Sequence, residues 1–79
     1  GRYKVEFENS DLVDGVLTVT HNKSSKNISF SYIKPDGSSQ SIEDIVTCAD
    51  LDYFTVNFNG GVDVGTHTIY FQTHPDLTL

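Results

Sequence analysis

The sequence predicts an all-β protein, a small antiparallel β-sandwich of about six to seven strands. Two observations support this prediction. Apolar and polar residues alternate with a period of two along most of the chain, which is typical of strands with one buried and one solvated face. Gly, Pro, Asn and Asp form turn signals about every 8–12 residues, and no stretch keeps a helical period.

The clearest strands lie within residues 17–33, on either side of the polar sequence KSSK. The runs LTVTHN and NISFSYI alternate before and after it. Their apolar, aromatic and histidine positions fall on one face, at Leu17, Val19, His21, Ile28, Phe30 and Tyr32. Two alternating runs with a short polar connection predict a β-hairpin, to which the other strands add.

The chain around this hairpin supplies one further strand and three turns. Residues 3–7, YKVEF, alternate apolar and charged side chains, as a half-buried strand does. Residues 9–11 are turn formers, and the Asp-Gly pair at 14–15 is a stronger turn signal ahead of the strand at 16–21. The sequence PDGSS at 35–39 ends the second strand of the hairpin, because Pro and Gly favour turn conformations.

The segment 41–48 has two interpretations. Ser41 ahead of two acids resembles a helix start, and one helical turn would align Ile42, Ile45 and Val46. The run is only about eight residues long and ends in the β-forming sequence IVTC. Length and composition therefore favour a bent strand, with a bulge near Glu43-Asp44.

The last third of the chain contains two more strands. Residues 53–58 alternate after an acidic turn at 50–52, and residues 67–72 alternate after a glycine-rich turn at 59–61. The sequence HPD at 74–76 ends regular structure and leaves a short tail. The predicted core consists of Val5, Phe7, Leu17, Val19, Ile28, Phe30, Tyr32, Ile45, Phe54, Val56, Phe58, Ile69 and Phe71.

The length predicts a single domain over residues 1–79, similar in size to an immunoglobulin domain. Cys48 is the only cysteine, so a disulfide framework is excluded. A domain this small gains little stability from its core and usually needs further support. We therefore expect a fragment of a larger protein or assembly, and Gly1, which is not a native start, agrees with this expectation.

The net charge of −6 is unevenly distributed. All five bases precede Pro35, so residues 1–34 carry +1 (five bases, four acids) and residues 35–79 carry −7 (no base, seven acids). Binding to a phosphate backbone requires Lys and Arg, so this balance argues against nucleic acid as a partner. No apolar run approaches the roughly 20 residues of a membrane span, and none is predicted.

Several features occur in a recognisable order. The sequence THN ends a strand at 20–22, and an alternating strand runs into turn chemistry over 27–38. The sequence TVNF follows at 55–58, and GTHTI opens the last strand at 65–69. This order resembles the short β-sandwich modules of bacteriophage tail fibres, tail-tip proteins and other virion appendages, over about residues 15–72.

The resemblance implies a non-enzymatic structural and attachment module of a tail fibre or tail-tip protein, with capsid decoration or a head fibre as close variants. Such modules often surround a three-fold axis. The implied partners are other virion proteins, identical protomers in a trimer, and a host surface glycan. The implied location is the virion, assembled in the host cytoplasm. The alternative is a carbohydrate-binding or adhesin-like module of a secreted bacterial protein, located outside the cell or on its surface.

Four residues suggest chemistry but lack the pattern that it needs. His21, His67 and His74 invite a metal interpretation, yet no two of them have a ligand spacing such as H-x-H or H-x₃-H. Cys48 with a histidine would form a nucleophile–base pair, but its strand setting favours a buried structural thiol. We therefore predict no metal, no cofactor, no catalytic residue and no enzyme activity.

The acids and asparagines in turns are interpreted in the same way. Asp50, Asp52 and Asp63 are candidate calcium ligands, but they lack the order of a dedicated cation loop and are interpreted as solvated turn acids. The glycosylation sequons at 22–24 and 27–29 matter only in a eukaryotic secretory setting. We assign no function to either group.

Two tyrosines remain as candidate site residues. Tyr53 and Tyr70 fall on the strand faces opposite to the predicted core. Exposed aromatic rings stack on sugars, or they are buried against a second protomer or a neighbouring domain. The small core favours the second interpretation, so the sequence predicts an interface or ligand surface at these two residues.

Overall fold

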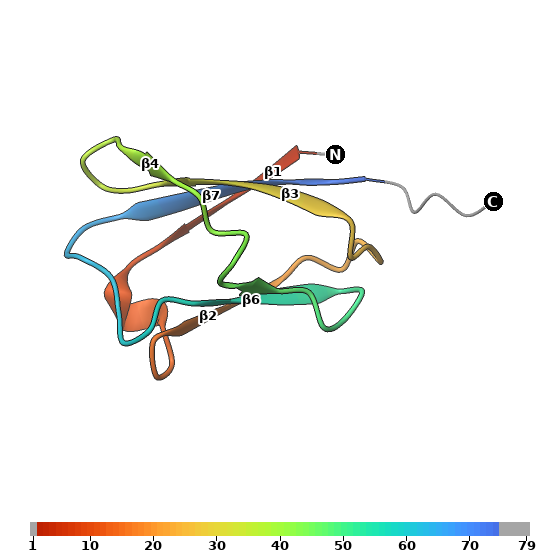
Figure 1. Cartoon of the computed structure of the whole chain (residues 1–79), viewed down its shortest axis with the longest axis horizontal. Coiled ribbons are helices and arrows are strands. Elements are labelled where there is room, and N and C mark those ends of the chain that lie inside the picture. The colour runs from red at the N-terminus through yellow and green to blue at the C-terminus, as the bar shows by residue number, and fades with distance from the viewer. Residues whose placement is uncertain (1, 75–79) are drawn as a thin grey trace.

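The computed structural model describes residues 2–74, which form seven strands in two antiparallel sheets packed face to face (Figure 1). Sheet A has the order β1 (Arg2–Phe7), β7 (His67–Thr73), β3 (Ile28–Ile33), β4 (Ser39–Gln40). Sheet B has the order β2 (Val16–Thr20), β6 (Tyr53–Asn57), β5 (Val46–Thr47). The prediction of a small all-β sandwich is confirmed. Gly1 and residues 75–79, which hold most of the predicted last turn and the tail, lie outside the described residues.

A short 3-10 turn, η1 (Asn9–Asp11), connects β1 to β2. It forms where turn residues were predicted. The Glu8 backbone N–H donates to the Asp11 carboxylate (2.8 Å), and the Asp11 N–H donates back to the Glu8 carbonyl (2.9 Å). The part of the chain that the structure describes contains no helix long and apolar enough to cross a membrane.

The predicted hairpin of residues 17–33 is wrong, because β2 and β3 belong to different sheets. Strand β2 pairs with β6, and β3 pairs with β7 and β4. The connection between β2 and β3 crosses from one layer to the other and pairs with the turn before β6. The N–H groups of His21 and Asn22 donate to the Asp52 carbonyl (2.8 and 3.0 Å), and the Ser25 N–H donates to the Leu51 carbonyl (2.7 Å).

The hairpin prediction is wrong because the alternation of apolar and polar residues does not determine which strands pair. A period of two fixes which face of a strand is buried, but it does not fix which strand is the neighbour. The apolar faces of β2 and β3 are buried by meeting across the core instead of lying side by side. Asn22 and Ser24 adopt positive φ angles of 54° and 51°, so the connection turns out of the plane of sheet B.

The predicted bent strand over 41–48 is also wrong. Strand β4 ends at Gln40 in sheet A and β5 begins at Val46 in sheet B, with a turn between them in which the Ile45 N–H donates to the Ile42 carbonyl (3.0 Å). Ile42 is only 1% exposed and belongs to the core, from which the prediction omitted it. The segment crosses between the sheets at this point because Ile42 is buried between them.

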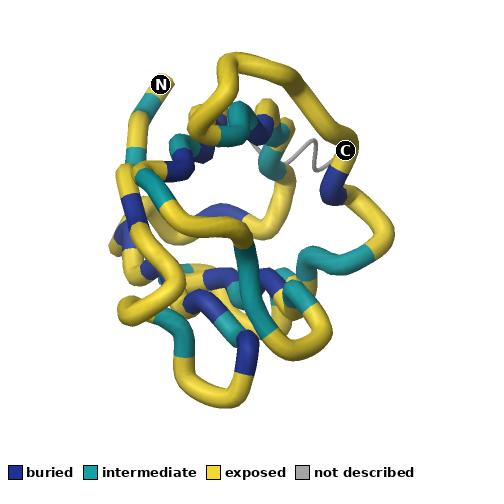
Figure 2. Tube along the Cα trace, turned by 90° about the vertical axis from the view of Figure 1, so that its left-hand side faces the viewer, coloured by how far each residue is buried: buried dark blue, intermediate teal, exposed yellow. Residues whose placement is uncertain are grey.

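The core joins both layers, and Figure 2 shows buried and less buried positions alternating along the strands. The buried hydrophobic residues are Phe7, Leu17, Val19, Tyr32, Ile42, Phe54, Val56, Ile69 and Phe71. The other predicted core residues are partly exposed and pack against them: Val5, Ile28, Phe30, Ile45 and Phe58. At the centre, the Phe54 ring of β6 lies edge-on to Phe30 of β3 (4.9 Å between centroids, 73°) and to Phe71 of β7 (5.3 Å, 74°).

The predicted Asp14-Gly15 turn closes a tight hairpin at the start of β2. Val13 and Val16 exchange two backbone hydrogen bonds (2.9 and 3.0 Å), and the two residues between them have positive φ angles of 53° and 79°. These angles define the turn type that Asp-Gly pairs favour. A Cβ atom at Gly15 would lie 2.5 Å from the Gly60 backbone nitrogen, so glycine is required here for contact as well as for conformation.

Candidate functional site

The structure places Tyr53 and Tyr70 on opposite sides of the sandwich. Tyr53 lies on the outward side of β6 in sheet B, and Tyr70 lies on the outward side of β7 in sheet A. The two side chains are 37% and 40% exposed. They therefore belong to two separate surfaces, which we describe in turn.

Tyr70 lies at the middle of a polar surface that crosses three strands. Tyr70 lies between Lys4 of β1 and Ser31 of β3. The next outward position of β7 is Gln72, which lies between Arg2 of β1 and Ser29 of β3. All six positions face outward because their neighbours in sequence face the core. We call this surface the Tyr70 face: Arg2, Lys4, Ser29, Ser31, Tyr70 and Gln72.

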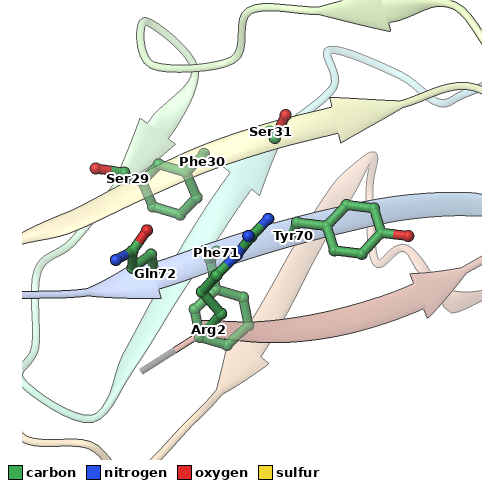
Figure 3. Close-up of a pocket in the computed structure, with 7 residues that line it drawn as sticks. All are labelled: Arg2, Ser29, Phe30, Ser31, Tyr70, Phe71 and Gln72. Atoms are coloured by element: carbon green, nitrogen blue, oxygen red, sulfur yellow. The ribbon is translucent and has the colours of Figure 1, made fainter.

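Two shallow hollows on the Tyr70 face share its arginine and its tyrosine. One, of about 100 Å³, is lined by Arg2, Tyr70 and Gln72 together with residues of β3. The other, of about 270 Å³, is lined by Arg2, Tyr3, Lys4 and Tyr70. Figure 3 shows the Arg2 side chain extending from β1 across β7, between Gln72 and Tyr70. The surface thus offers an aromatic ring, hydroxyl and amide groups and a guanidinium within reach of one small ligand.

The surface around Tyr53 differs in chemistry. Tyr53 lies opposite Thr20, and the next row across the sheet is Thr18, Thr55 and Thr47. We call these residues the Tyr53 face. The outward positions of β2, β6 and β5 carry no charged side chain. Leu51, just before β6, is a further exposed apolar residue.

His67 is a buried structural residue, only 1% exposed. Its Nε2 lies 2.8 Å from the Asp63 carbonyl, which can only accept, so Nε2 carries the proton. The Tyr32 hydroxyl, 2.6 Å from Nδ1, therefore donates to the ring. Burial, and secondly the charge of Asp63, raises the pKa of Tyr32, which keeps this donor protonated. The ring also stacks on Phe7 (5.3 Å), so His67 ties the 59–66 loop to the core.

The other two histidines have their own partners. His21 accepts a hydrogen bond at Nδ1 from the Lys23 N–H (3.1 Å), and its ring packs between Phe54 and Phe71 (6.0 and 5.9 Å). His74 Nε2 lies 2.8 Å from the Ser29 hydroxyl. No group of three His, Cys, Asp or Glu side chains within residues 2–74 is arranged to hold a metal ion.

Cys48 and the turn acids have structural surroundings. Burial raises the pKa of the half-buried Cys48 thiol, more than the nearby Lys26 charge lowers it, so the thiol stays protonated at neutral pH. Asp50 accepts a hydrogen bond from the Asp52 N–H (2.9 Å), and Asp52 accepts from the Ser24 N–H (3.1 Å). These two carboxylates stabilise the facing turns that replace the predicted hairpin.

The sequence pattern predicts Tyr70 as a site residue, but it does not predict the five residues around it. Arg2, Lys4, Ser29, Ser31 and Gln72 come from three strands far apart in the sequence. Their outward orientation followed from the alternation, but nothing in the sequence indicated that β7 lies between β1 and β3. No protein-family description, no curated protein and no solved structure matches this chain. The chemistry of the two faces therefore indicates which ligands the domain can bind.

Proposed function

We propose that this domain is a non-enzymatic attachment module, of the kind carried by bacteriophage tail fibres and tail-tip proteins, and that it contacts a host surface sugar through the Tyr70 face. The observation that supports this proposal is the exposed Tyr70 ring among hydroxyl, amide and guanidinium groups. The same chemistry suits a carbohydrate-binding module of a secreted bacterial protein. The two settings share the proposed ligand class and differ in location, the virion or the bacterial surface.

The layout of the face fits a sugar. The C–H side of a pyranose ring stacks on an aromatic ring, while its hydroxyl groups need donors and acceptors at the edge of that ring. Tyr70 supplies the ring, and Ser31 and Gln72 lie beside it. Neighbouring strands are about 4.8 Å apart, so the face from β1 to β3 measures about 10 Å, which suits one or two sugar rings.

The residues with catalytic potential support a non-enzymatic role. Both ring nitrogens of His67 are engaged inside the core. The pKa of Cys48 is raised, which disfavours the thiolate that a nucleophile requires. Within residues 2–74, the state of these two side chains therefore supports a role in binding instead of catalysis.

For the Tyr53 face we propose contact with identical protomers or other virion proteins. An uncharged sheet face with an exposed tyrosine resembles the centre of an interface, from which charged residues are depleted. A trimer is the arrangement that fibre modules suggest. The two faces lie on opposite sheets, so one can be covered while the other stays open.

A glycan array with matched variants tests the attachment proposal. We expect the parent domain and Tyr53→Ala to bind the same sugars, and Tyr70→Ala to bind at least about tenfold more weakly, which corresponds to about 1.4 kcal/mol. Both tyrosines are similarly exposed, so each substitution should leave the fold intact. Absence of sugar binding by the parent domain, or equal loss in both variants, would contradict the proposal.

A further inference from the structure

The Tyr70 face is electropositive on an acidic domain. Two of the five bases, Arg2 and Lys4, lie on it, while the chain as a whole carries −6. Glu6 is the one acid at an outward position of β1, β7, β3 or β4, and it lies 3.9 Å from the Lys4 ammonium. The acids at positions 36–63 lie outside these outward strand positions. The sign of charge on this face is therefore the reverse of that of the molecule.

Of the two bases on this face, Arg2 is the one whose charge is available to bind an anionic ligand. Within residues 2–74 its guanidinium has no ion-pair partner, whereas Lys4 is paired with Glu6. Its side chain lies across β7 and borders both hollows, between the tyrosine ring and the Gln72 amide (Figure 3). A guanidinium is planar and presents a fork of donors that fits a carboxylate in a bidentate manner.

We propose that the sugar recognised by the Tyr70 face carries a carboxylate, as uronic and sialic acids do. The sugar ring stacks on Tyr70, its carboxylate pairs with Arg2, and its hydroxyls bond Gln72 and Ser31. Lys4 adds to the attraction without a direct contact. The inference rests on the proposed function and deepens it, because a neutral sugar would leave unused a guanidinium that has no ion-pair partner within residues 2–74.

Two pairs of probes that differ mainly in charge test the inference. The ¹⁵N-labelled domain is titrated with trigalacturonic acid and its methyl ester, and with 3′-sialyllactose and its methyl ester. We expect one of the acids to bind at least about tenfold more tightly than its neutral counterpart, with chemical-shift changes confined to residues 2–4, 29–31 and 70–72. Raising the salt concentration to about 0.5 M should weaken acid binding, because it screens the charges.

Charge variants assign the preference to one residue. Arg2→Gln should reduce the ratio of the affinity for the acid to that for its neutral counterpart from at least about ten to about one. Lys34→Gln removes the same charge beyond the far end of β3 and should keep the preference. Equal loss in both variants would mean that net charge alone is responsible and would overturn the inference.

The experiment separates this inference from the function on which it rests. If each acid and its neutral counterpart bind equally, and Tyr70→Ala weakens both, the attachment proposal stands and the acidic-sugar inference is wrong. If no sugar of the two pairs changes the chemical shifts of residues on the Tyr70 face, the acidic-sugar inference is also wrong. The glycan array then decides the attachment proposal.

Discussion

The hydrogen bond between Tyr32 and His67 shows how much the stability of this domain depends on single buried polar groups. It joins the hydroxyl of one core strand to the imidazole of the next, at 2.6 Å, and both side chains are buried. A buried acceptor that loses its donor costs about 1–3 kcal/mol. A small domain has a net stability of only about 3–5 kcal/mol. One hydroxyl group therefore accounts for a substantial part of it.

The raised pKa of Tyr32 predicts a loss of stability in alkaline solution. Tyrosine in the unfolded chain titrates near pH 10, and the folded-state pKa is higher because of burial and the charge of Asp63. Between these two pKa values the unfolded chain binds fewer protons than the folded one, so the free energy of unfolding falls as the pH rises above about 10. Urea denaturation between pH 8 and 11 measures this slope.

Two tyrosine variants separate the contributions to this slope. Tyr32→Phe should lower the stability at pH 8 by about 1–3 kcal/mol and flatten the fall above about pH 10. Tyr70→Phe removes an exposed hydroxyl and should leave the stability at pH 8 unchanged. Cys48, whose pKa is also raised, adds a fall that begins near pH 9 and remains in both variants. An unchanged slope in Tyr32→Phe would show that its hydroxyl is not desolvated.

At the scale of the elements, the turn between Val13 and Val16 positions two segments at once. The Gly15 carbonyl accepts a hydrogen bond from the Phe58 N–H (2.9 Å). Gly15 also lies against the backbone of Gly60. Backbone-to-backbone contact of this kind leaves no room for a side chain. The turn therefore fixes the start of β2 against the end of β6.

Gly15→Ala should destabilise the domain far more than Gly37→Ala. Both glycines have positive φ angles, 79° and 89°, so each substitution has a conformational cost of about 1 kcal/mol. A Cβ at Gly37 meets nothing within 4 Å, whereas one at Gly15 meets backbone at 2.5 Å. We expect a difference in unfolding free energy of more than about 1 kcal/mol by urea denaturation. Equal losses would mean that the turn and the Gly60 loop separate freely.

The elements also show what the sequence predicts and what it leaves open. The strands at 16–20, 28–33, 53–57 and 67–73 were predicted to within a residue or two, because a period of two is a local property. The pairing of β2 with β6 joins residues more than thirty positions apart, and alternation carries no information about such pairs. The same limit applies to the Tyr70 face, where the tyrosine was predicted and its neighbours on β1 and β3 were not.

At the scale of the whole molecule, size and surface together predict self-association. The core is thin, no disulfide is available, and the Tyr53 face is uncharged. Against association stands the net charge of −6 on each copy, which repels other copies unless salt screens it. Association should therefore depend on both protein concentration and ionic strength.

Light scattering at several concentrations, with and without about 0.5 M salt, measures this dependence. We expect a mass that rises toward a trimer at high concentration in salt, because screening removes the repulsion while the contact between uncharged Tyr53 faces remains. Tyr53→Ala should lower the mass, and Tyr70→Ala, on the opposite sheet, should not. A monomer mass under every condition would exclude self-association of this segment and leave the Tyr53 face for a different partner protein.

The pairing of the first and last strands has a mechanical consequence. Strands β1 and β7 are antiparallel neighbours with Arg2 opposite Gln72, so the start of β1 and the end of β7 leave the sheet on the same side (Figure 1). Tension between these two ends acts along the hydrogen bonds that join β1 to β7. It therefore breaks these hydrogen bonds one pair after another from one end, instead of loading all of them at once. A domain with this geometry gives way at low force. It therefore suits a place in which no load is carried between the start of β1 and the end of β7.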